Sequence, residues 1–147
     1  MIRFLLAAVV ALAAPLAAAE ERLTVTSQYG PDKPQSQAWV RFAEVLEEAR
    51  PGAYDVNIVT SGALGGEKEE AEAVRLGAVT GALSTVANLT TWVPEGAVLD
   101  LPFVFRDREH IARVLAGPLG ERLREAYRAQ GFEAPAFIVF GARHLLG

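Results

Sequence analysis

Hydrophobic residues recur along this chain in two different periods, which predict strands and helices in alternation. Residues 23–28 and 54–60 alternate apolar and polar side chains and are rich in β-branched residues, as in half-buried strands. Residues 79–84 are small and apolar, as in a strand buried on both faces. Two further apolar segments complete the set, and Pro102 is expected to end the first of them. The predicted strands are residues 23–28, 54–60, 79–84, 97–103 and 134–140.

Helical spacing fills most of the intervals between these strands. Trp39, Phe42, Ala43 and Leu46 fall at i, i+3, i+4 and i+7, so they are expected to form one core-facing side of a helix. The next predicted helix carries four glutamates early and Arg75 late, which complements the helix dipole and predicts a largely solvated face. The predicted helices are residues 36–50, 67–76, 108–116 and 119–130.

Strands that alternate with helices indicate an α/β fold with a mainly parallel, wound sheet and helices on both faces. In such sheets a ligand binds beyond the carboxyl ends of the strands. By that rule, polar groups from distant parts of the chain meet at one edge of the sheet. The set contains no nucleophile paired with a base, which favours ligand recognition over catalysis. The gathered positions are Gln28, the turn that ends in Glu67, residues 84–88, Pro102 and Arg143.

The turn between the second strand and the second helix is rich in glycine. Gly62, Gly65 and Gly66 allow sharp backbone bends and expose amide N–H groups where the helix begins, which suits a polar or anionic ligand. A tight strand-to-helix turn without a ligand would need the same glycines, so both interpretations remain open on this stretch alone.

The amino terminus has the composition of a secretory signal peptide. Arg3 precedes a short apolar run, and residues 17–19 are alanines that form an A-x-A cleavage site before Glu20. The apolar run is shorter than the roughly 20 residues of a membrane-spanning helix. We therefore expect residues 1–19 to be a signal peptide and the mature chain to be exported to the periplasm.

Composition excludes several classes of function. The chain has 147 residues, enough for one domain with its own core, and it contains no cysteine, which excludes disulfides, Cys-ligated zinc and cysteine nucleophiles. His110 and His144 are its two histidines, and neither has a metal-binding spacing, so no metal or cofactor is expected. With 18 acidic residues against 14 basic ones, one of which leaves with the leader, the chain is a poor candidate for nucleic-acid binding.

Several spaced motifs resemble one family. Together, and in this order, they are similar to the extracytoplasmic solute-binding subunits of TRAP transporters, of the DctP type, over essentially the whole mature chain. The motifs are Leu64-Gly65-Gly66-Glu67, Val74-Arg75-Leu76-Gly77, Val93-Pro94-Glu95, Val98-Leu99-Asp100-Leu101-Pro102-Phe103 and Gly141-Ala142-Arg143-His144.

The resemblance implies a periplasmic-binding-protein-like lobe and a function in transport. Members of the family are not enzymes; they capture a small organic acid in the periplasm and deliver it to TRAP membrane permease subunits. Arg143 would lie near the ligand carboxylate, which its planar guanidinium can bind through two parallel hydrogen bonds; a surface charge near the chain end is the alternative. The ligand contacts that the resemblance implies are Gln28, Glu67, Thr85, Asn88 and Arg143.

The chain departs from the family pattern in two places. Thr80-Gly81 stands where the family usually has an acidic residue, and the sequence ends at Gly147, where family members continue into a second lobe. We therefore expect residues 20–147 to form the amino-terminal lobe alone, as a fragment, a prematurely terminated product or one half of a split protein. A single lobe would expose apolar surface that favours self-association.

Two other functions fit the same sequence. The lobe could be a periplasmic sensing or interaction module that presents its ligand state to a receptor. An α/β enzyme that uses Glu67 or His144 as a base is the third hypothesis, and it predicts turnover that is lost when Glu67 is replaced by glutamine.

Overall fold

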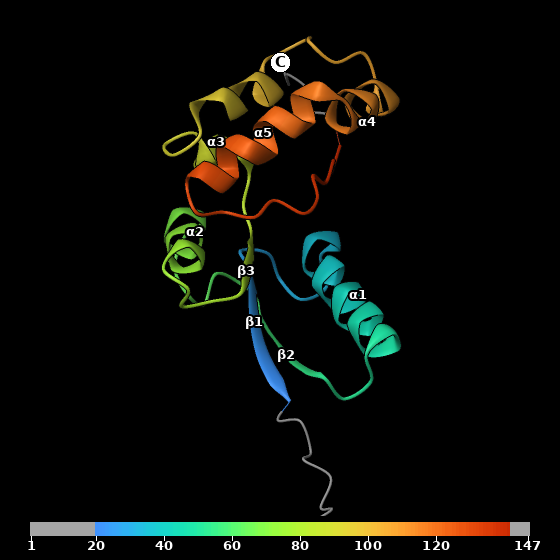
Figure 1. Ribbon diagram of the computed structural model, residues 1–147, viewed down its shortest axis with the longest axis vertical. Helices are drawn as coiled ribbons and strands as arrows, with labels where there is room; N and C mark the ends of the chain where they lie inside the picture. Colours follow the sequence, from blue (N-terminus) through green and yellow to red (C-terminus); the bar gives the residue numbers. More distant parts are fainter. Residues whose placement is uncertain (1–19, 142–147) are drawn as a thin grey trace, which may run out of the picture.

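A computed structural model describes residues 20–141 of the chain. The predicted signal peptide (1–19), Arg143 and His144 lie outside the described residues. Within these residues there are three strands, five α-helices and one 3-10 helix (η2) (Figure 1). The strands alternate with α1 and α2 in the first part of the chain, and the second part is helical. The elements are β1 (Glu21–Ser27), α1 (Pro34–Ala49), β2 (Tyr54–Val59), α2 (Glu67–Arg75), β3 (Gly81–Leu83), α3 (Val86–Leu89), η2 (Pro94–Asp100), α4 (Arg108–Ala116) and α5 (Pro118–Ala129).

The strands form one parallel sheet in the order β2-β1-β3. Thr24 pairs with Asn57 on one side of β1, and Val25 pairs with Gly81 on the other. Each neighbour of β1 is reached through a helix, as parallel strands require. Figure 1 shows α1 and α2 on opposite sides of the sheet. The predicted mainly parallel sheet with helices on both faces is therefore confirmed.

Helix α1 rests on the sheet through Trp39. Its indole Nε1 donates a 2.9 Å hydrogen bond to the backbone oxygen of Thr26, and its ring lies over Gly81, where an added Cβ would approach it to 3.1 Å. Phe42 packs edge-on against Trp39, with ring centroids 5.5 Å apart, but stays 38% exposed. The prediction that Phe42 is buried in the core is therefore wrong. Three strands are too few to cover the whole apolar side of a 16-residue helix.

A hydrophobic core joins α2 to the helices of the second half of the chain. Helices α4 and α5 pack against each other, and α5 also packs against η2. The Trp92 and Phe132 rings meet edge-on with centroids 5.6 Å apart. This layer lies beyond one end of the sheet (Figure 1). The buried residues of this core are Ala71, Val93, Leu115, Leu123, Tyr127 and Phe132.

Two predicted strands are wrong. Most of residues 97–103 belongs to η2, which begins at Pro94 and places Gly96 against Tyr127 and Val86, so Pro102 does not end a strand. Residues 134–140 are irregular, because no strand within residues 20–141 pairs with their backbone. Ala134 and Phe137 pack on the helical core instead, and the Phe137 and Tyr127 ring centroids lie 6.2 Å apart. Apolar composition alone does not make a strand without a hydrogen-bonded neighbour.

Glu70 corrects the prediction that the glutamates of α2 are solvated. Its side chain faces the sheet and is 0% exposed, and Oε1 accepts a 2.5 Å hydrogen bond from the equally buried hydroxyl of Thr26. Within the described part of the chain, Glu70 Oε2 has no hydrogen-bond partner. The sequence carried a signal for this burial, since Glu70 precedes buried Ala71 and lies one helical turn before Val74.

Tyr127 offers a first test of the helical core. Its side chain is 2% exposed, and its hydroxyl has no hydrogen-bond partner in residues 20–141. Burial, and secondarily the charge of Asp100, raises the pKa of Tyr127. We expect Tyr127→Phe to stabilise the fold by about 1 kcal/mol, because it removes an unpaired buried hydroxyl.

Tyr127→Phe should also reduce the loss of stability at alkaline pH, because phenylalanine has no proton to release. Because the folded pKa of Tyr127 lies above its unfolded value, the unfolded chain releases this proton first, and stability falls as the pH rises past the unfolded pKa. Urea unfolding of both proteins at neutral and alkaline pH measures the two effects. If Tyr127→Phe is less stable than the unchanged chain, the Tyr127 hydroxyl makes a stabilising hydrogen bond, contrary to this prediction.

Candidate functional site

The glycine-rich turn, residues 61–66, is tied to the carboxyl end of β1 by main-chain bonds. Ser61 N donates to Tyr29 O at 2.9 Å, and Gly62 N donates to Ser27 O at 3.2 Å. The side-chain amide of Gln28 donates to the backbone oxygen of Gly65. These bonds hold the end of β1 and the start of α2 together as one surface.

Gly62 is required by this arrangement. Its φ of 63° lies in the left-handed region, and a Cβ at this position would come within 2.8 Å of Gln28 Oε1. Glycine alone avoids both the backbone strain and the clash. The glycine therefore allows the Gln28 side chain to lie directly against the turn.

Glu67 connects the start of α2 to the start of α3. Its Oε2 accepts three hydrogen bonds: from Thr85 N at 2.6 Å, from Thr85 Oγ1 at 2.9 Å and from Asn88 Nδ2 at 2.8 Å. Asn88 Nδ2 also lies 2.9 Å from Thr85 Oγ1. All three residues are half-buried. The fold thus brings together residues 18 and 21 positions apart in the sequence.

Four of the five residues predicted for the site lie in this neighbourhood. Glu67, Thr85 and Asn88 are hydrogen-bonded to one another, and Gln28 joins them through the turn that precedes Glu67. We call these four residues the strand-end cluster. Arg143 lies outside the described residues. The cluster offers a carboxylate, two amides and a hydroxyl, which can hydrogen-bond a polar ligand.

Metal binding and membrane insertion find no support in the described residues. No group of three or more metal-ligating side chains occurs within residues 20–141. None of the helices in that range is both long enough and apolar enough to cross a membrane.

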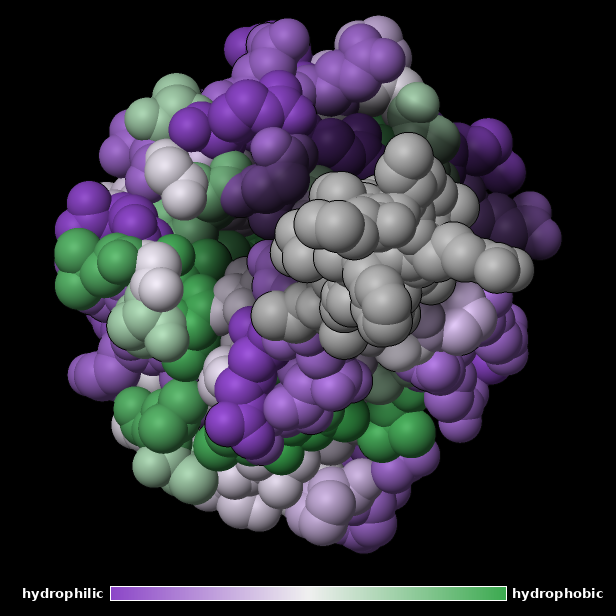
Figure 2. Space-filling view, turned by 60° about the horizontal axis from the view of Figure 1, so that its bottom comes forward, coloured by the Kyte–Doolittle hydropathy of each residue, from purple (hydrophilic) through white to green (hydrophobic). Residues whose placement is uncertain are grey.

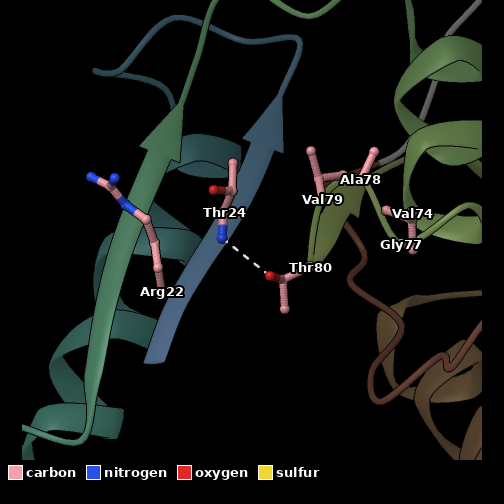
Figure 3. Close-up of a pocket in the computed structure, with 7 residues that line it drawn as sticks. All are labelled: Arg22, Thr24, Val74, Gly77, Ala78, Val79 and Thr80. Carbon is pink, nitrogen blue, oxygen red and sulfur yellow. Dashed lines mark hydrogen bonds between the residues drawn. The ribbon is translucent and has the colours of Figure 1, made fainter. Parts of the chain in front are cut away.

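Two hollows lie away from the strand-end cluster. One, of about 390 Å³, lies beside the amino-terminal half of β1, next to Thr24 and Thr80. Figure 3 shows the Arg22 side chain on its edge, with the guanidinium pointing away from Thr80. That guanidinium pairs with Asp55 of β2 at 3.1 Å, so it is already neutralised. This hollow lies toward the wrong end of the strands for a ligand of a wound sheet.

The second hollow is an apolar groove between α2 and the residues that follow α3. Leu76, 70% exposed, and Trp92 line it, with Lys68, Glu69 and Glu72 among its other residues. The hydrogen bond from Arg75 lowers the pKa of Glu72.

Figure 2 shows that hydrophobic side chains on the face it displays form separate patches among hydrophilic ones.

Comparisons with known proteins point to one family. Residues 25–147 match the model of the family described as bacterial extracellular solute-binding protein, family 7, or DctP. A solute-binding protein of Verminephrobacter eiseniae is 36% identical over 88% of this chain and 38% of its own length. The C4-dicarboxylate-binding periplasmic protein DctP of Rhodobacter capsulatus is 32% identical over 86% of this chain and, again, 38% of its own. The chain thus spans well under half the length of these relatives.

Solved structures agree with the sequence relatives. A TRAP periplasmic solute-binding protein of Sulfurospirillum deleyianum with bound succinate superposes with a TM-score of 0.70 at 32% identity, over 77% of this chain and 36% of that one. The sugar-acid-binding protein DctPAm of Advenella mimigardefordensis, in complex with galactonate, gives 0.73 at 28% identity, over 76% and 36%. The predicted periplasmic-binding-protein-like lobe is confirmed. The chain belongs to the DctP family, family 7 of the bacterial extracellular solute-binding proteins, as its spaced motifs predict.

Proposed function

We propose that this chain supplies one wall of the site with which a periplasmic TRAP-type solute-binding protein captures a small organic acid for its membrane permease. The observation that carries the proposal is the strand-end cluster, in which polar side chains from three segments meet where a wound sheet binds its ligands. Similar proteins were solved with succinate and galactonate bound, which supports an organic acid as the ligand.

The side chains would divide the recognition of the ligand. Gln28, Glu67, Thr85 and Asn88 hydrogen-bond its polar groups, and the bonds of Thr85 and Asn88 to Glu67 Oε2 hold these three side chains in place. Arg143 binds its carboxylate through the two parallel donors of a guanidinium. The protein binds and releases its ligand unchanged, without catalysis. Residues 1–19 direct export and are then removed.

Three kinds of partner follow from this proposal. They are the organic acid, the permease subunits and, through apolar side chains that remain exposed, a second copy of the chain. Phe103, 95% exposed on the loop after η2, is the most exposed of these side chains.

The proposal predicts where a ligand perturbs the protein. Succinate and galactonate, titrated to millimolar concentrations, are expected to shift the backbone amide NMR signals of Gln28, residues 62–67, Thr85 and Asn88. Weak binding suffices for this measurement, because a ligand in fast exchange between its free and bound states shifts each affected amide signal in proportion to occupancy. Shifts confined to the groove beside Leu76, or no shift with either acid, would contradict the proposal.

Two matched threonine variants sharpen the same titration. Thr85→Val removes a hydroxyl that is bonded within the strand-end cluster. Thr80→Val removes a hydroxyl outside the cluster, which accepts a 3.1 Å bond from Thr24 N in the middle of β1. We expect Thr85→Val to weaken binding by about threefold to tenfold, the usual effect of one lost hydrogen bond. Thr80→Val should leave the binding curve unchanged.

A further inference from the structure

Most hydrogen-bond donors of the strand-end cluster are engaged, whereas several of its acceptors are not. Asn88 Nδ2 contacts both Glu67 Oε2 and Thr85 Oγ1. A carboxylate oxygen accepts and cannot donate, so the nitrogen of this amide must be the atom that faces it. Asn88 Oδ1 then points elsewhere, and it has no hydrogen-bond partner among residues 20–141.

The Gln28 amide is oriented in the same way, with one N–H of its Nε2 still available as a donor. Its Nε2 donates to the backbone oxygen of Gly65, which again fixes the amide with its nitrogen toward an acceptor. Its Oε1 lies beside Gly62, 2.8 Å from the position of an absent Cβ. In the described part of the chain this oxygen accepts no hydrogen bond.

Glu67 and Thr85 complete the pattern. The Thr85 hydroxyl donates its proton to Glu67 Oε2, which receives all three of the bonds made to that carboxylate by residues 20–141. Glu67 Oε1 remains as an acceptor that carries part of the negative charge. Three acceptor oxygens of the strand-end cluster, one each on Gln28, Glu67 and Asn88, therefore accept no hydrogen bond within residues 20–141.

We propose that this wall recognises hydroxyl groups of the ligand, so that the protein selects a hydroxy acid over an unsubstituted one. The inference rests on the proposed function and names the substrate class for the same site. A hydroxyl donates to an acceptor oxygen, whereas a ligand carboxylate has only acceptors to offer and is repelled by Glu67.

Nearby positive charge does not reverse this preference. Lys68, the next residue after Glu67, lines the separate groove with Leu76 and Trp92. The N-terminal amides of α2 would favour an anion, but Glu67, Glu69 and buried Glu70 all lie in that first turn and oppose one. The wall formed by residues 20–141 thus suits the hydroxylated part of a ligand.

Three acids that differ only in hydroxyl number test the proposal on the 147-residue chain. Succinate, malate and tartrate share a four-carbon dicarboxylate and carry no, one and two hydroxyls. We expect the affinity, measured from the amide shifts of Thr85 and Asn88, to rise by about twofold to tenfold per correctly placed hydroxyl in the better-binding enantiomer. Both enantiomers of malate and of tartrate are titrated.

The outcomes separate this inference from the proposed function. Equal affinity for the three acids, or an affinity that falls with each added hydroxyl, contradicts recognition of hydroxyl groups by this wall. The proposed capture of an organic acid would not be affected. Absence of shifts with every acid overturns both.

A pair of glutamate variants locates the selectivity. Glu67→Gln removes the charge and gives the site a donor, and should reduce the preference for tartrate over succinate to about twofold or less. Glu69→Gln removes the same charge in the same helical turn, outside the cluster, and should keep the preference. Loss of preference in both variants would assign it to general charge and overturn the role of the cluster. The acid series on the unchanged chain decides the proposal even if Glu67→Gln does not fold.

Discussion

Gly120→Ala should destabilise the protein by about 3 kcal/mol or more, a large share of the stability of a domain of this size. Gly120 is buried near the start of α5, where the chain turns out of α4 through Gly117. An added Cβ would lie 1.8 Å from the carbonyl oxygen of Leu115 and 2.6 Å from its carbonyl carbon. Both atoms are backbone, so only a shift of one helix against the other can remove the clash.

Gly117→Ala is the matched control at the same helix junction. A Cβ there would lie 3.5 Å from Arg113 O and 3.6 Å from Val114 O, which is ordinary contact, and the backbone angles suit alanine. Urea unfolding followed by circular dichroism compares the two variants with the unchanged chain. Equal midpoints for Gly120→Ala and Gly117→Ala would show that α4 and α5 separate easily, contrary to this packing.

The second large effect is expected at Thr26. Thr26→Val keeps the shape of the side chain but removes the hydrogen bond to the buried Glu70 carboxyl. Neither Glu70 oxygen would then have a partner within residues 20–141. Because a buried polar group left unpaired loses its hydration without compensation, we expect a loss of about 2–3 kcal/mol.

A double variant identifies the cause. Thr26→Val combined with Glu70→Met replaces both polar partners by apolar groups of similar size, and it also removes the unpartnered Oε2. We expect the double variant to recover the stability of the unchanged chain or to exceed it by about 1 kcal/mol. Unfolding free energies of the single and double variants give the coupling energy. If the double variant loses as much as the sum of the single ones, the pair does not act as a unit.

Residue patterns predicted the layer that carries the candidate site. The alternation in residues 23–28 and 54–60, and the spacing of Trp39 and Leu46, reflect local periods that survive in the fold as β1, β2 and α1. Residues 134–140 are also apolar and include β-branched Ile138 and Val139, yet they are irregular. Periodicity reports which side of a segment is apolar, whereas a strand also needs a neighbour to bond with, and single-segment patterns contain no information about neighbours.

The candidate site was predicted in part: the sequence indicated its position but not the bonds within it. Its position followed from the sequence, since the strand-end rule and the family motifs both led to Gln28, Glu67, Thr85 and Asn88. Their mutual bonds did not, because hydrogen bonds between side chains 18 and 21 residues apart depend on how α2 and α3 dock. The orientation of the Asn88 amide, with its nitrogen bonded and its oxygen left as an acceptor, is a consequence of those bonds.

By itself the sequence determined the order of most elements, the parallel sheet and the family, because these follow from local periods, glycine positions and spaced motifs. Only the tertiary structure decided that Glu70 is buried against Thr26 and that Glu67 holds Thr85 and Asn88. Which of several similar glutamates faces a sheet, a neighbouring helix or water depends on packing angles between elements. Those angles are set by side chains far apart in the chain, and no local pattern encodes them.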